Sequence, residues 1–153
     1  MINIIQQAHK YCDRIAIVSD NQSYTFQELL SASSDFAHIL LRGTRDLNES
    51  RVAYMVSPGF DYVRVQWGIW QAGGIIVPLC LTYPLPSLRY TIENSDATIL
   101  VVSPEYAPLL EPLATEKGIR LIVLEEEIEK YTEGGGKIWI LRRYPILKKA
   151  AER

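Results

Sequence analysis

The stretch Trp70-Gln-Ala-Gly-Gly-Ile-Ile-Val-Pro-Leu79 decides the fold of this 153-residue chain. A helical pattern ends at Gly73-Gly74, and glycine is the usual residue just beyond the end of a helix. The short apolar run that follows ends at Pro78, which lacks the N–H group that the interior of a sheet requires. A continuous apolar run of this kind is typical of a buried strand in a parallel sheet. The stretch therefore predicts one helix–strand unit of a layered fold.

The same alternation of helix and strand extends along the chain. The turn residues Asp20-Asn21 join two short strands into a predicted hairpin, and Thr25 with Glu28 has the spacing of a capping box at the start of a helix. Strands are expected at 14–19, 22–25, 51–56, 75–79, 98–102 and 120–124, and helices at 26–41, 60–72, 86–94 and 105–117. This order predicts an α/β protein with a mainly parallel sheet and flanking helices.

Composition and charge narrow the class of protein. Hydrophobic residues make up 48% of the chain and charged residues 22%, which is typical of a single globular domain. The net charge of -2 provides no global field that would attract nucleic acid or a membrane surface. No apolar run approaches the ~20 residues that span a bilayer, and the first residues lack a signal sequence. Cys12 and Cys80 are expected to be free thiols, and the expected location is cytoplasmic.

None of the residues that usually carry chemistry forms a recognisable set. Gly73-Gly74 ends a helix, whereas a dinucleotide-binding fingerprint would open one. His9 and His38 have no Cys or His at metal-ligand spacing, and Cys80 is expected to be a buried small apolar residue. Trp67 and Trp70 could stack on a base, but core packing is the favoured interpretation. We therefore predict no catalytic, cofactor-binding or metal-binding residue in this chain.

Several segments, in order, resemble the adenylate-forming acyl-CoA synthetases, the AMP-dependent synthetase/ligase family. The resemblance covers residues 12–124 and rests on Tyr24-Thr-Phe-Gln-Glu-Leu29, Arg51-Val-Ala-Tyr-Met-Val56 with Phe60-Asp-Tyr62, Trp70 to Leu79, and Tyr83-Pro84 with Leu88 and Tyr90 through Asp96. Within the family, Cys12-Asp-Arg-Ile-Ala16 and the segment from Gln66 to Leu79 look most like the malonyl-CoA and methylmalonyl-CoA synthetases.

The resemblance implies an enzyme that activates a small carboxylic acid with ATP and Mg²⁺ to an acyl-adenylate and transfers the acyl group to CoA. Members of that family are several times longer, and their phosphate loop and catalytic Lys lie beyond the segments matched here. We therefore expect an inactive N-terminal fragment whose partner is the remainder of the ligase. It should leave apolar surface uncovered, with Trp67 or Trp70 at that edge, and should self-associate. A non-catalytic complementing fragment, or a piece of a fatty-acyl or aryl-CoA ligase, is the alternative.

The end of the chain differs in composition from the rest. From Lys137 onward six basic residues stand against Glu152, a net charge of +5, which leaves -7 for the preceding residues. We therefore divide the chain into a partial synthetase domain, 1–133, and a basic tail, 134–153. One permitted codon spelling of the tail, read one base out of register, gives E-N-L-D-I-A-S-I-S-Y-I-E-E-S-R-R-A, which resembles the family's approach to its phosphate loop. A frameshifted tail should make few contacts with the sheet.

Overall fold

The computed structural model describes residues 2–125 and 139–142 and confirms the predicted α/β class. The helices are α1 (Asn3–Ala8), α2 (Phe26–Leu41), α3 (Phe60–Gln71), α4 (Leu85–Asn94) and α5 (Ala107–Lys117), with 3-10 turns η1 (His9–Tyr11) and η2 (Pro104–Tyr106). The strands are β1 (Ile15–Ser19), β2 (Gln22–Thr25), β3 (Arg51–Met55), β4 (Ile75–Pro78), β5 (Ile99–Val102), β6 (Arg120–Glu125) and β7 (Trp139–Arg142). Where an element was predicted, its bounds agree to within one or two residues, whereas α1, η1 and β7 were not predicted.

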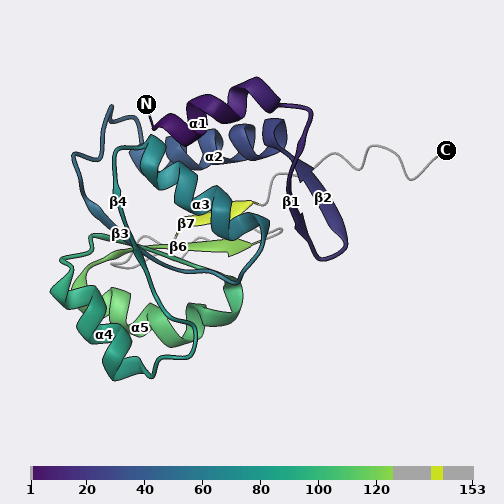
Figure 1. Ribbon diagram of the computed structural model, residues 1–153. Coiled ribbons are helices and arrows are strands. Elements are labelled where there is room, and N and C mark those ends of the chain that lie inside the picture. Colours follow the sequence, from purple (N-terminus) through teal and green to yellow (C-terminus); the bar gives the residue numbers. More distant parts are fainter. Residues whose placement is uncertain (1, 126–138, 143–153) are drawn as a thin grey trace.

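Five parallel strands form the main sheet in the order β4-β3-β5-β6-β7. In register, Val52 on β3 faces Ile76 on β4 and Ile99 on β5. Figure 1 shows α2 and α3 on one face of the sheet and α4 and α5 on the other. Each face has its own core, one built around Tyr54, Phe36 and Ile69 and the other around Met55, Leu88 and Leu110. The sheet is therefore sandwiched between two helical layers, as its apolar strands require.

The position of β4 corrects one expectation about the deciding stretch. The apolar run 75–79 was expected to be a buried strand, but β4 is the edge strand of the sheet and Ile75 is 42% exposed. An edge strand has one unpaired side, which explains why Pro78 is tolerated there. The glycine stop is confirmed, because Gly73 has a φ of +78° directly after α3 and a side chain at this position would overlap the carboxylate of Asp46.

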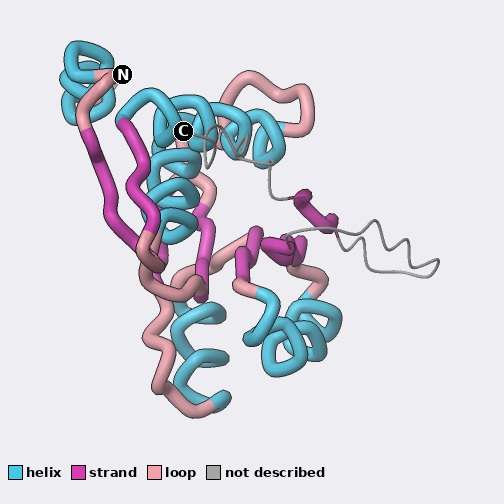
Figure 2. Tube along the Cα trace, turned by 90° about the vertical axis from the view of Figure 1, so that its right-hand side faces the viewer, coloured by secondary structure: helices cyan, strands magenta, loops and turns pink. Residues whose placement is uncertain are grey.

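The predicted hairpin and its capping box are both present. β1 and β2 pair antiparallel and form a separate two-stranded sheet beside the main one (Figure 2). Asp20 and Asn21 connect the strands with φ angles of +50° and +60°, the left-handed pair that a two-residue hairpin turn needs. Thr25 accepts a hydrogen bond from the Glu28 N–H, and the Glu28 carboxylate accepts one from the Thr25 N–H.

The two helices on the hairpin side of the sheet approach each other very closely. A β-carbon placed on Gly68 of α3 would lie 2.7 Å from Cδ1 of Phe36 and 2.9 Å from the backbone oxygen of Ser33, both on α2. Trp67 is 5% exposed in a third apolar cluster with Ile5 of α1 and other side chains. The favoured interpretation of Trp67 as a core residue is therefore confirmed, and it does not lie at an uncovered edge.

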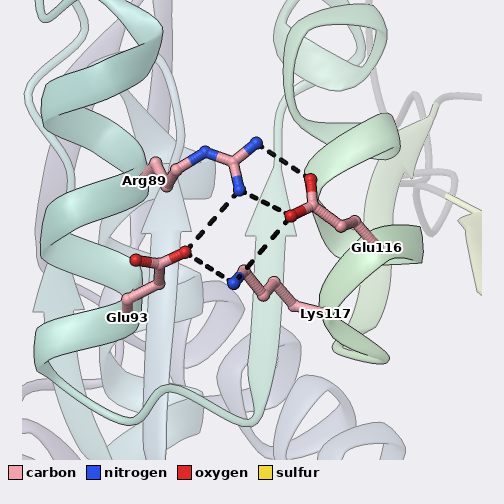
Figure 3. Close-up of polar contacts among 4 residues, drawn as sticks. All are labelled: Arg89, Glu93, Glu116 and Lys117. Atoms are coloured by element: carbon pink, nitrogen blue, oxygen red, sulfur yellow. Dashed lines mark hydrogen bonds and ion pairs between the residues drawn. The ribbon is translucent and has the colours of Figure 1, made fainter.

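On the opposite face, α4 and α5 are joined by an ion network at the surface (Figure 3). Arg89 on α4 forms a two-pronged contact with Glu116 on α5, at 2.8 and 2.9 Å. Lys117 on α5 contacts Glu93 on α4 at 2.7 Å. The hydrogen bond from Arg89 lowers the pKa of Glu116, and the bond from Lys117 lowers the pKa of Glu93. Such exposed pairs orient the two helices but contribute little to stability individually.

The described part of the tail corrects a second expectation. Residues 139–142 form β7, which pairs in parallel with β6 from Ile122↔Trp139 to Glu125↔Arg142. The expectation of few contacts between the tail and the sheet is therefore wrong for these four residues. The acidic run beyond Glu125, the triple glycine at 134–136 and residues 143–153 lie outside the described residues.

Candidate functional site

A crevice lies at the carboxyl ends of the parallel strands, where the order of the sheet reverses. From β3 the chain moves outward to β4 and then returns to place β5 on the other side of β3. Loops leaving β3 and β5 consequently run in opposite directions, which opens a crevice between them. A cavity of about 420 Å³ occupies this place. In open α/β sheets this is the position at which ligands bind, so the topology alone makes it the candidate site.

Two similar loops form the floor of the crevice. Each strand is followed by a Ser-Pro pair, Ser57-Pro58 after β3 and Ser103-Pro104 after β5. The Ser57 N–H donates to Oγ of Ser103 at 3.0 Å, and the Ser103 N–H donates to the backbone oxygen of Met55 at 3.0 Å. Oγ of Ser57 donates to the Glu105 carboxylate. Because the buried Ser103 lies after β5 and bonds both to Met55 of β3 and to Ser57 in the loop that follows β3, it holds the two sides of the crevice at a defined separation.

The turn of the β1–β2 hairpin forms the outer wall. Ser19 and Asp20 line the crevice, and a β-carbon on Gly59 would lie 2.8 Å from Oγ of Ser19. Gly59 has a φ of +147°, so a larger residue would be strained there and would also displace the turn. The stacked rings of Tyr24 and Phe60, with centroids 4.2 Å apart, attach the hairpin to the first turn of α3. The wall is thus held by backbone geometry and by an aromatic contact.

The charged groups of the crevice are mostly acidic. Asp20, Asp61 and Glu105 line it together with Arg64, which is 6% exposed. The Arg64 guanidinium lies 3.1 Å from Oδ1 of Asp61 and compensates that carboxylate. Among the described residues that line the crevice there is no His, Cys or Lys. Such a surface can accept hydrogen bonds from hydroxyl or amino groups of a ligand, but it lacks the groups that usually transfer protons or attack a carbonyl.

The crevice does not fit the triphosphate of ATP or a magnesium ion. A polyphosphate is normally held by Lys or Arg and by a row of backbone N–H groups, whereas here Arg64 is paired with Asp61 and the carboxylates of Asp20 and Glu105 would repel a polyphosphate. The described residues contain no group of three or more His, Cys, Asp or Glu that could hold a metal ion.

The residues singled out in the sequence lie away from this crevice. His38 on α2 places Nδ1 2.8 Å from the backbone oxygen of Ser34, and His9 lies in η1. Cys80 was expected to be buried, and this was wrong. It is exposed after the edge strand β4, where a hydrogen bond with the Thr82 side chain lowers the pKa of its thiol. The sheet edge leaves that residue uncovered, which its apolar neighbours in sequence did not indicate.

The crevice residues themselves were missed by the sequence analysis. The signal that could have found them is the repeated Ser-Pro pair, because each pair directly follows an apolar strand. Carboxyl ends of neighbouring parallel strands lie at the same edge of a sheet, so the pairing of β3 with β5 necessarily places Ser57 close to Ser103. Arg64 and Asp61 carried no such signal, because a charged pair on a helix is usually solvated.

Comparison with known proteins agrees with the predicted resemblance. The mouse malonate–CoA ligase ACSF3, described as mitochondrial, is 34% identical over 141 residues, which cover 86% of this chain and 24% of the relative. The human protein of the same name is 33% identical over 82% of this chain and 22% of its own length. A malonate–CoA ligase of Arabidopsis thaliana is 26% identical over 83% of this chain and 23% of the relative. The chain thus spans about a quarter of the length of these relatives.

Solved structures show the same fold. MatB from Rhodopseudomonas palustris superposes with a TM-score of 0.68 at 23% identity, over 80% of this chain and 25% of that one. The anthranilate CoA ligase AuaEII, solved with anthranoyl-AMP, superposes with a TM-score of 0.70 at 19% identity, over 89% of this chain and 27% of its own. The sequence profile of the family described as "AMP-binding enzyme" matches residues 4–143. The chain therefore belongs to the AMP-binding enzyme family, within which it is similar to malonate–CoA ligases.

Proposed function

We propose that this chain forms the N-terminal quarter of an acid–thiol ligase that activates a small carboxylic acid, malonate or a close homologue, and transfers it to CoA. The observation that carries the proposal is the similarity of 26–34% to malonate–CoA ligases over more than three quarters of the chain. ATP, Mg²⁺ and CoA would be the cofactors of the whole ligase. The partner of this chain would be the rest of that ligase, which would supply the phosphate loop and the catalytic Lys.

The crevice is the part of this chain that we assign to ligand binding. Ser57 and Ser103 set its width through their mutual hydrogen bond, and the acidic groups favour a ligand with hydroxyl or amino donors. In the assembled ligase it would form one wall of a larger site. The role of this chain is then to position and to enclose, not to carry out the chemical step.

A chimeric enzyme tests the proposal. Residues 1–125 would replace the matched segment of the mouse malonate–CoA ligase, and CoA thioester formation would be measured with malonate, with a fatty acid and with an aryl acid. We expect activity with malonate. Activity with only a fatty or aryl acid would instead support the alternative branch of ligases. A folded chimera that forms no thioester with any of these acids would support a non-catalytic fragment and would refute the proposal.

The role of the crevice is tested in the same chimera. Ser103→Ala removes the acceptor for the Ser57 N–H and should loosen both loops, so we expect the activity to fall several-fold, mainly through the KM for one of the substrates. Ser31→Ala, an exposed change on α2, is the matched control and should leave both constants unchanged. Equal activity of the two variants would show that the crevice has no part in ligand binding.

Two finer expectations belong to the same proposal. Cytoplasmic location stays a prediction, to be tested by fractionation. The vertebrate relatives are described as mitochondrial, and the described residues contain no helix long and apolar enough to cross a membrane.

The frameshifted tail also stays a prediction, supported by the charge difference at Lys137. Sequencing the gene downstream tests it, because a shifted frame should encode a Thr/Ser/Gly-rich loop close to this segment.

A further inference from the structure

The crevice at the carboxyl end of the sheet carries uncompensated negative charge. Asp20 and Glu105 line it, and each carboxylate accepts a hydrogen bond from a serine hydroxyl, which leaves its charge in place. Among the described side chains neither carboxylate forms an ion pair, and the Arg64 guanidinium is paired with Asp61. A hollow that is partly enclosed by protein strengthens the field of such carboxylates, so its occupant should be cationic.

The last described strand brings the chain to the rim of this crevice. β7 runs parallel to β6 and, through it, to β5 and β3, so all four strands end at the same edge of the sheet (Figure 1). Leu124 on β6 lines the crevice, and its register partner on β7 is Leu141. Neighbouring strands lie about 4.7–4.9 Å apart, so the backbone that leaves β7 starts about one strand spacing from the lining. An extended chain advances by about 3.3–3.6 Å per residue, so residues 143–153 can reach every part of the crevice.

The segment that follows β7 has the complementary charge. It reads Arg143-Tyr-Pro-Ile-Leu-Lys-Lys-Ala-Ala-Glu-Arg153, which contains four basic residues against Glu152, and it lies outside the described residues. Its apolar stretch, Tyr144 to Leu147, stands between basic groups, and the crevice likewise combines carboxylates with apolar side chains such as Phe60 and Leu124. A cavity of about 420 Å³ holds a few side chains of such a segment.

The covalent link between segment and crevice makes weak contacts sufficient. Exposed ion pairs stabilise little individually. A short tether, however, keeps the segment near the crevice at an effective concentration in the millimolar range, so that such contacts form within one chain. Because the charges are exposed to solvent, the contacts should also weaken as the salt concentration rises.

We propose that residues 143–153 dock into the crevice of the same chain, with the ammonium groups of Lys148 and Lys149 against the carboxylates of Asp20 and Glu105. The segment then occupies the place at which the topology of the sheet positions a ligand. Docking depends on charge and reach alone, whether or not the chain is part of a ligase. The chimera with residues 1–125 lacks the segment, so failure of that enzyme and failure of the docking are distinguishable.

Zero-length cross-linking of the full chain tests the contact. A carbodiimide joins a carboxylate to a lysine amine as an amide, with water transferred to the reagent, only where the two groups touch. We expect cross-links from Lys148 or Lys149 to Asp20 or Glu105 in a product close to the monomer mass of 17.4 kDa. Their yield should fall several-fold between about 0.02 M and about 0.5 M salt. An equal yield of cross-links to Glu111, which is exposed on α5, or cross-links found only in a dimer would overturn the proposal.

A single charge in the crevice can be removed with little change in structure. Asp20→Asn suits the left-handed φ of +50° at this position, because Asn tolerates that conformation. It should lower the yield of cross-links to Glu105 several-fold, since the crevice loses one of the two charges that hold the segment. Glu111→Gln removes the same charge outside the crevice and is the matched control, with an unchanged yield. Equal cross-linking of Glu105 in Asp20→Asn and in the wild type would show that the crevice does not hold the segment.

Hydrogen exchange provides a second readout, which needs no reagent. The Ser57 N–H donates to a side-chain oxygen at the floor of the crevice, so a docked segment should shield it. Lys148→Glu combined with Lys149→Glu should speed its exchange several-fold. Lys10→Glu combined with Arg45→Glu makes the same change of charge at exposed residues outside the crevice and should not. Exchange that is unchanged in the first variant, or faster by the same factor in both, would refute the docking.

Discussion

Replacement of Gly68 by Ala tests how strictly the packing of α2 on α3 limits this fold. The new methyl group would lie 2.7 Å from Cδ1 of Phe36 and 2.9 Å from the backbone oxygen of Ser33, whereas apolar contacts are optimal at about 3.5–4.0 Å. The ring can rotate or shift, but the backbone oxygen cannot move without displacing α2. Overpacking of this kind costs about 1–3 kcal/mol, and the better helix propensity of Ala returns at most about 1 kcal/mol. We expect a net loss of about 1–2 kcal/mol.

Urea denaturation followed by circular dichroism measures this loss. For a domain of this size each kcal/mol lowers the melting temperature by about 2–4 °C, so thermal unfolding should show the same direction. Ser31→Ala on the exposed face of α2 controls for the composition change and should alter the unfolding free energy by about 0.5 kcal/mol or less. If Gly68→Ala is as stable as the wild type, the close approach of the helices does not exist in solution and the reasoning fails.

Four further predictions concern the ion network, the core, a helix end and activity. Arg89 lowers the pKa of Glu116, so the stabilisation by this carboxylate is present above its ordinary pKa and is lost as the pH falls through the lowered pKa. Glu116→Gln should therefore flatten the acid dependence of the melting temperature between about pH 6 and pH 3, and a variant with the same acid dependence as the wild type would contradict this. The buried hydroxyl of Tyr54 has no hydrogen-bond partner among the described residues. Tyr54→Phe should therefore leave the free energy of unfolding unchanged or raise it by up to about 1 kcal/mol. A decrease in this free energy of more than about 1 kcal/mol would show that the hydroxyl has a partner. Arg120 donates to two backbone oxygens at the end of α2, so Arg120→Ala should cost about 2–3 kcal/mol, and a loss under about 0.5 kcal/mol in denaturation would contradict this. The 153-residue chain alone should form no malonyl-CoA from malonate, ATP and CoA in a thioester assay, and turnover above a buffer control would contradict its assignment as a quarter of the ligase.

The contact made by Arg120 could not be predicted from the sequence. Arg120 opens β6, yet its guanidinium satisfies the carbonyl groups of Ile39 and Leu40, about eighty residues earlier in the chain. Burial in this place lowers the pKa of Arg120 to about 10, with a smaller contribution from Arg42. From the sequence, a charged residue at the start of an apolar strand is expected to lie in solvent. Only the packing of α2 on the sheet places the Arg120 side chain where it caps the end of that helix.

Local sequence patterns were sufficient to predict the features that depend on interactions between neighbouring residues. The capping box of Thr25 and Glu28, the turn at Asp20 and the stop at Gly73 depend on neighbouring residues and on the φ angles that each residue tolerates, so their positions could be predicted. The apolar strands separated by helices determined the class of fold and, with the motifs they carry, the family. These features follow from hydrogen bonding and hydrophobic periodicity within a few turns of chain.

What depends on contacts between distant segments could only come from the tertiary structure. The apolar run at 75–78 is the same whether its strand lies at the centre or at the edge of the sheet, so neither the exposure of Cys80 nor the edge position of β4 was predicted. The crevice arises because β5 pairs with β3 instead of β4, which brings Ser57 and Ser103 together across 46 positions of sequence. The order of the strands depends on how both helical layers pack on the whole sheet, so it cannot be predicted from any single stretch of the chain.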